Sequence, residues 1–99
     1  MARAAQLFEA MRSAAMTEKE IAGLMQNLLK ERLDNMTIFV KHLASNGGLR
    51  EGMDLLLAAE MVWTITSPEV FLLLTRDRNY SKGQYTTWLE TTLTRLLLP

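Results

Sequence analysis

Residues 55–65 read Leu-Leu-Leu-Ala-Ala-Glu-Met-Val-Trp-Thr-Ile, and this stretch decides the fold. All of its residues except Glu60 and Thr64 are apolar. Asp54 is a suitable N-cap in front of it, so we expect a helix over residues 55–66. A helix that is apolar nearly all round is buried on several sides. Because a chain of 99 residues can hardly surround one helix, we expect a second copy to cover part of it, in a homodimer.

Two further helices are predicted before this stretch. Residues 2–15 are rich in Ala, Leu, Met, Glu and Arg, which are strong helix formers. Thr17 and Glu20 have the spacing of a capping box, which predicts a long helix over residues 18–45. Asn46-Gly47-Gly48 ends this helix, because glycine adopts the left-handed C-cap conformation without strain.

The chain after the apolar stretch predicts two more helices. Ser67-Pro68-Glu69 is typical of a helix start and opens a short helix over residues 68–75. A polar loop, Arg76 to Tyr80, follows. Ser81 and Gln84 then form a capping box that opens the last helix, residues 82–98. The sequence therefore predicts an all-α fold, a five-helix bundle that forms a single domain over residues 1–99.

The composition argues against several classes of function. Eleven Lys and Arg balance eleven Asp and Glu, so the net charge is zero and direct binding of nucleic acid by this chain is disfavoured. Cysteine is absent and there is one histidine, so we expect no metal site and no cofactor. The longest apolar run is the five residues Leu55–Ala59, far short of a membrane span. With no signal peptide evident, we expect a soluble cytoplasmic protein without membrane contact.

Charged residues offer little support for catalysis, so we predict that the chain is not an enzyme and has no catalytic residue. Glu31 and Asp34, beside Lys30 and Arg32, have the pattern of solvated surface. The same interpretation applies to the basic group made by Arg76-Asp77-Arg78 and Lys82. Glu60, within the apolar stretch, is either a buried acid or the one polar position of its helix. If it were the acid of a small cofactor-free enzyme, Glu60→Gln would abolish activity.

The segment from Asn46 to Pro99 resembles the C-terminal half of the TetR/AcrR-like bacterial transcriptional regulators. The residues that carry the resemblance form an ordered string: Gly48-Leu49-Arg50-Glu51-Gly52, then Ala58-Ala59-Glu60-Met61-Val62-Trp63-Thr64-Ile65-Thr66-Ser67-Pro68-Glu69-Val70, then Tyr85-Thr86-Thr87-Trp88-Leu89 with Thr92-Leu93, and Leu96-Leu97-Leu98-Pro99. Residues 7–15 also look like the family helix that precedes the long one.

The resemblance implies an all-α homodimer in which a C-terminal domain binds a small effector and dimerises. In that family an N-terminal three-helix domain with a helix-turn-helix binds operator DNA. Too few residues precede Leu7 to hold three helices. The chain is therefore expected to be the sensor and dimerisation domain, either as a fragment or as a protein that naturally lacks the DNA-binding domain. The effector would be small and apolar or amphipathic, and it would favour one dimer geometry over another.

Two residue sets are the candidate binding sites. Methionine and aromatic residues suit an adaptable cavity between the long helix and the third helix, although each residue taken alone is more often a core residue: Met25, Met36, Phe39, Met61 and Trp63. The segments that pair subunits in the family predict a dimer interface, against the alternative of packing within one chain: Ala59, Val62, Trp63, Thr66, Phe71, Trp88 and Thr92. The alternative function is a stand-alone helical interaction module that forms homodimers or mixed dimers.

Overall fold

A computed structural model describes residues 2–99, and every regular element within this range is helical. The helices are α1 (Ala2–Ala15), α2 (Lys19–Ser45), α3 (Leu55–Ile65), α4 (Pro68–Leu72), the π-helical segment η1 (Leu73–Asp77) and α5 (Lys82–Leu97). The all-α prediction is confirmed.

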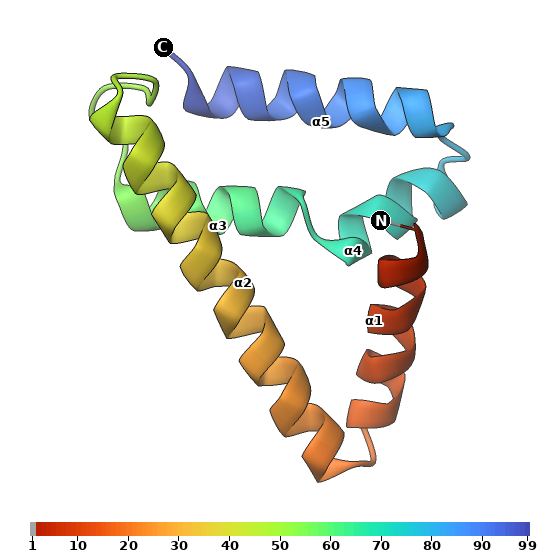
Figure 1. The fold of residues 1–99 in the computed structure, drawn as a ribbon. Coiled ribbons are helices and arrows are strands. Elements are labelled where there is room, and N and C mark those ends of the chain that lie inside the picture. The colour runs from red at the N-terminus through yellow and green to blue at the C-terminus, as the bar shows by residue number, and fades with distance from the viewer. Residues whose placement is uncertain (1) are drawn as a thin grey trace.

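The five-helix bundle is not what the structure shows. Only Thr66 and Ser67 separate α3 from α4, and η1 follows α4 directly, so residues 55–77 form one bent helical arm among four. Figure 1 shows α1 and α2 as the two legs of a triangle that α3 and α4 close, while α5 runs back along α3. α3 packs on the second half of α2, whereas α1 meets α2 and α4, and α5 touches α3 only sparsely.

The molecule is a thin, open plate. Its extents are 44 × 31 × 16 Å, and a helix with its side chains is about 10–12 Å across. The thinnest dimension therefore holds little more than one helix, which is why most helices have an uncovered side. The radius of gyration is 15.1 Å, whereas a compact chain of this length has one of about 12.6 Å.

The local signals for the later helix starts are confirmed. The Leu57 N–H donates to the Asp54 carboxylate over 2.9 Å, and the Val70 N–H donates to Ser67 Oγ over 3.2 Å. Ser81 and Gln84 form both bonds of the predicted capping box. The end of α2 is also confirmed, because Gly47 has a φ of +73°.

The predicted capping box of α2 is wrong. Thr17 still belongs to the final turn of α1, where its hydroxyl donates to the Ala14 carbonyl over 3.4 Å. Glu18 is the N-cap of α2 and makes no side-chain cap bond, so the helix begins one residue later than predicted. The Thr17 hydroxyl, which a capping box needs as an acceptor, is thus bonded to the end of α1 instead.

The predicted loop from Arg76 to Tyr80 is also too long. Helical structure continues through Asp77 in π geometry, and the Arg78 N–H donates to the Leu73 carbonyl over 3.1 Å. Arg76 forms two hydrogen bonds with Glu9 of α1, which anchors this turn. A second ion pair, Arg12 to Glu69 at 3.5 Å, joins the same two arms.

The main core lies where α2, α3 and the end of α5 meet. Its buried side chains are Val40, Ala58, Ala59, Val62 and Leu97. The far side of α3 is uncovered, and Leu56 and Leu57 are 55% and 48% exposed. The expectation that α3 is buried on several sides therefore fails within one chain.

The arm from Leu55 to Asp77 is long and apolar enough, by these two measures, to cross a membrane. The sequence-based expectation considered only the unbroken run Leu55–Ala59. That expectation missed the arm, because isolated polar residues break its apolar run while its mean hydropathy stays high. About a third of the most apolar window is buried inside the molecule.

Candidate functional site

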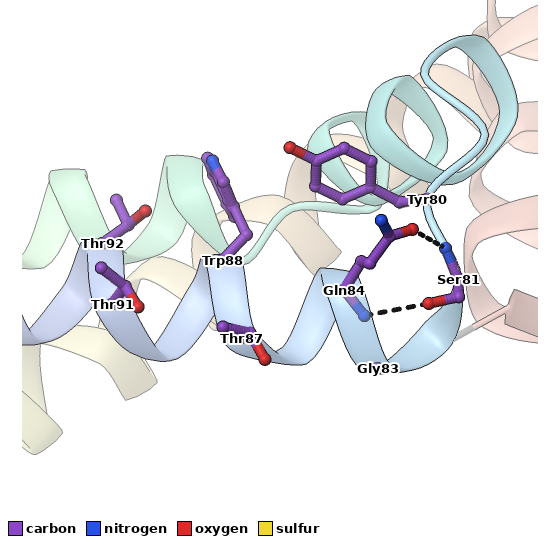
Figure 2. A pocket seen from close by; sticks show the side chains of 8 residues that line it. All are labelled: Tyr80, Ser81, Gly83, Gln84, Thr87, Trp88, Thr91 and Thr92. Atoms are coloured by element: carbon purple, nitrogen blue, oxygen red, sulfur yellow. Dashed lines mark hydrogen bonds between the residues drawn. The ribbon is translucent and has the colours of Figure 1, made fainter.

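An open groove runs along the first half of α5 and is the largest of the concave surfaces described here. Figure 2 shows Tyr80 and Trp88 standing on the same side of the helix with Gln84 between them. The groove has a volume of about 680 Å³, and its wall is mostly apolar. Its lining residues are Tyr80, Ser81, Gly83, Gln84, Thr87, Trp88, Thr91 and Thr92.

Local bonds fix the end of this groove. Ser81 N–H donates to the Gln84 amide oxygen over 2.8 Å, and the Gln84 N–H donates to Ser81 Oγ over 3.1 Å. The Tyr80 N–H donates to the Leu74 carbonyl over 2.9 Å, which ties the groove to η1. An aromatic pair on a rigid helix start is suited to bind another apolar surface, because its contact area is preformed.

Arg32 makes two hydrogen bonds between helices away from the groove. Its Nη2 donates to the Trp63 carbonyl over 2.6 Å and to Thr66 Oγ1 over 2.8 Å. Its guanidinium also lies 5.7 Å from the centre of the Trp63 ring. Burial lowers the pKa of Arg32 from its usual range. This side chain therefore closes the junction between α2 and the end of α3.

None of the cavities described here is lined by any of the five predicted ligand residues. Met25 is buried, while Met36, Met61 and Trp63 are half-buried and Phe39 is 49% exposed. Met36 packs against the main core, and the Trp63 indole donates to the Leu29 carbonyl over 3.0 Å. The cavities discussed here lie against α1, α4, η1 and α5 and contain none of the five.

The seven predicted interface residues divide into two groups. Ala59 and Val62 are buried in the chain's own core, and Thr66 accepts the bond from Arg32. Trp63 is likewise engaged by α2. Phe71 packs edge to face on Tyr85, with 4.8 Å between ring centres. Trp88 and Thr92 line the open groove, so these two are placed to meet another molecule.

Glu60 is exposed, so the hypothesis of a buried acid is wrong. Its helix turns this one carboxylate to solvent, as the alternative interpretation of a single polar position expects. Within residues 2–99, no cluster of three or more His, Asp or Glu side chains is arranged to hold a metal ion.

Sequence reasoning missed most of the groove and the role of Arg32. Gln84, Thr87, Trp88, Thr91 and Thr92 follow the i, i+3, i+4, i+7, i+8 spacing of one helix face, which was a usable signal. Arg32 lies in the apolar stripe of α2, three residues after Leu29 and four before Met36. A charged residue in such a stripe indicates a buried partner.

Comparison with known proteins yields nothing: no protein-family model matches this chain, and no curated protein or solved structure matches it.

Proposed function

We propose that this chain is a self-associating helical module, and that it serves as the ligand-sensing and dimerisation domain of a TetR-like transcriptional regulator. In this proposal a separate N-terminal domain binds DNA, and the chain itself contributes the dimer contact and an effector site. The exposed surface area of the chain is the observation that carries the first part. The resemblance from Asn46 to Pro99 carries the assignment to a regulator.

The chain exposes more surface than a compact monomer of its mass. Its accessible area is 6965 Å², whereas a folded monomer of 11.3 kDa exposes about 5,700 Å². The difference of about 1,200 Å² exceeds the roughly 800 Å² that each partner contributes to a standard stable interface. A second copy that covers the excess would return the chain to ordinary compactness, so the occupant we propose is another copy of this chain.

The outer side of α3 and the groove of α5 are the surfaces that the second copy would cover. Leu55, Leu56 and Leu57 are exposed in succession on α3. Trp88 presents its ring in the groove of α5 (Figure 2), and tryptophan in an apolar setting is a common source of binding energy in interfaces. Each Å² of apolar leucine surface that stays in water costs about 25 cal/mol relative to its burial.

The alternative is a stand-alone interaction module that forms homodimers or mixed dimers with a longer regulator. The same exposed surface supports it, because uncovered apolar surface favours a partner without fixing what else that partner carries. The two functions differ in whether a DNA-binding segment is encoded in frame upstream. They also differ in whether the chain captures a longer protein that shares its C-terminal half.

Sedimentation equilibrium of the chain at micromolar concentration tests the proposal. We expect a mass of two chains. Leu56→Glu should weaken the dimer at least about thirtyfold, because it places a charge in the interface centre. Leu24→Glu is the matched control, since Leu24 has nearly the same exposure, 52%, but lies on α2. A monomeric wild-type chain would overturn the proposal, and equal effects of the two substitutions would overturn the placement of the interface.

A further inference from the structure

A second cavity lies where the starts of α1 and α5 meet the α4–η1 segment. Its volume is about 550 Å³, within the range of about 300–1,000 Å³ that is usual for small-molecule sites. It shares Tyr80 with the groove shown in Figure 2. Three separate arms contribute residues, so the shape of the cavity depends on how these arms are held together.

Three aromatic residues line the cavity, Phe71, Tyr80 and Tyr85, and two of their rings are in contact. Phe71 and Tyr85 pack edge to face, with an angle of 82° between the rings, and Tyr85 is only 7% exposed. Thr75 lies one turn after Phe71, and its hydroxyl donates to the Phe71 carbonyl over 2.8 Å. Because this hydroxyl is already bonded to the backbone, Thr75 presents its methyl group and needs no hydrogen-bond partner from a ligand. The wall therefore suits an apolar or aromatic body.

The charges at this cavity are all positive. Arg3 and Lys82 line it, and no acidic residue does. The ion pairs among residues 2–99 are Arg12 with Glu69 and Arg76 with Glu9, so neither Arg3 nor Lys82 is paired with a carboxylate. Glu9, the acid of the neighbouring hollow, is already bonded to Arg76. An occupant of the cavity therefore meets two uncompensated cations.

We infer that this cavity binds a small amphipathic carboxylate, with its apolar body against Phe71 and Tyr85 and its carboxylate toward Arg3 and Lys82. A neutral ligand of the same shape would gain the apolar contact but not the ion pairs, and a cation would be repelled. The inference deepens the proposed function and rests on it in one respect, namely that this ligand is the effector. The ligand would bridge α1, η1 and α5, and α5 also carries the groove proposed for the second copy.

Calorimetric titration with octanoate, 1-octanol and octylammonium tests the charge preference. We expect octanoate to bind about fivefold more tightly than octanol, with octylammonium weakest, since exposed charge pairs contribute modestly. The double variant Arg3→Gln, Lys82→Gln should bring octanoate and octanol to nearly equal affinity. The control, Lys30→Gln with Lys41→Gln, removes the same net charge from exposed positions of α2 and should keep the preference. Raising the salt concentration should reduce the preference for octanoate over octanol, and it should do so equally in the wild-type chain and in this control.

Aromatic ¹H–¹³C spectra of the wild-type chain locate the apolar body. Octanoate should shift the ring signals of Phe71 and Tyr85 and leave those of Trp63 unchanged. Equal binding of the three probes, or shifts confined to Trp88, would overturn the inference. Sedimentation of the same samples separates the two proposals. A monomer that prefers octanoate would overturn only the proposed function, and a dimer that shows no preference would overturn only this inference.

Discussion

Arg32 donates from Nη2 to the carbonyl oxygen of Trp63 over 2.6 Å, and the Trp63 indole in turn donates to the Leu29 carbonyl on the same helix as Arg32. The two long-range bonds run in opposite directions between α2 and α3. The bond from Arg32 satisfies a carbonyl near the end of α3, where the helix itself leaves carbonyls without partners. In a plate with so little buried area, this exchange holds the two longest arms at a fixed angle.

Replacing Arg32 by Lys should destabilise the chain. Both bonds come from one nitrogen, Nη2, at the far end of the arginine side chain, and the shorter lysine side chain does not bring its nitrogen to the same place, so an acceptor is left unpaired. We expect a loss of about 1–3 kcal/mol in the free energy of unfolding, measured by urea denaturation at constant protein concentration. Arg12→Lys, at an exposed ion pair with Glu69, should cost less than about 1 kcal/mol. Equal losses for the two variants would show that the two bonds from Arg32 Nη2 have no special role.

Replacing Arg50 by Gln should loosen the end of α5. The Arg50 side chain donates to the carbonyls of Arg95 and Leu98, and its backbone N–H donates to the Leu97 carbonyl over 2.6 Å. The side chain therefore caps the C-terminus of a helix that lies far away in sequence. We expect faster amide hydrogen exchange over the last turn of α5, with a stability loss of about 1 kcal/mol. Glu51→Gln is the neighbouring control, and an unchanged exchange pattern in Arg50→Gln would contradict the capping role.

The helix content was predictable because its signals are local. Asp54, Ser67 and Ser81 each bond to a backbone N–H three residues ahead, so the sequence around them suffices. Thr17 has the same local signal, but the end of α1 uses its hydroxyl instead. A pattern of this kind predicts a helix start only where the preceding segment leaves the side chain free.

The open shape and the aromatic cavity were not predictable from periodicity. An apolar position such as Leu56 has the same pattern whether its own chain or a second one covers it. For this reason Ala59 is buried and Leu56 is mostly exposed, although both lie on the same apolar helix. The aromatic cavity joins Phe71 to Tyr85 across the bend at η1, and a pair 14 residues apart has no local signal.

The phenol of Tyr85 should titrate above its usual value. Burial raises the pKa of Tyr85, and the nearby Arg32 charge opposes this rise only in part. In a Tyr80→Phe variant, Tyr85 is the single remaining tyrosine, so absorbance at the phenolate band reports it alone. We expect a midpoint above about 10 in the folded chain and close to 10 in urea.

The same shift predicts a loss of stability in alkali. A folded-state pKa above the unfolded value means that the folded chain holds the proton more tightly. This contribution is complete below the unfolded pKa and falls away as the pH rises through the folded pKa. Urea midpoints of the Tyr80→Phe chain should therefore decline above about pH 10. A Tyr80→Phe, Tyr85→Phe chain is the control, and a decline of the same size in it would contradict the assignment.

The chain alone should bind duplex DNA too weakly to matter at physiological salt. Eleven cationic and eleven anionic side chains cancel, so there is no general excess of positive charge to displace counterions from phosphate. We expect no shift of a random duplex in a gel assay at micromolar protein. A shift that disappears as salt is raised would contradict this expectation and the view that DNA binding belongs to a separate domain.

The arm from Leu55 to Asp77 should stay out of the membrane although its length and hydropathy would allow a span. Glu60 and Glu69 lie within it, and a carboxylate deep in a bilayer costs about 2.5–3.5 kcal/mol on insertion scales. Glu69 is also paired with Arg12 of α1, a contact that insertion would break. We expect the expressed chain in the supernatant after high-speed centrifugation, and no flotation with neutral lipid vesicles. The variant Glu60→Leu, Glu69→Leu should shift part of the chain to the membrane fraction, and a wild-type chain that resists alkaline extraction from that fraction would show that the arm spans the bilayer.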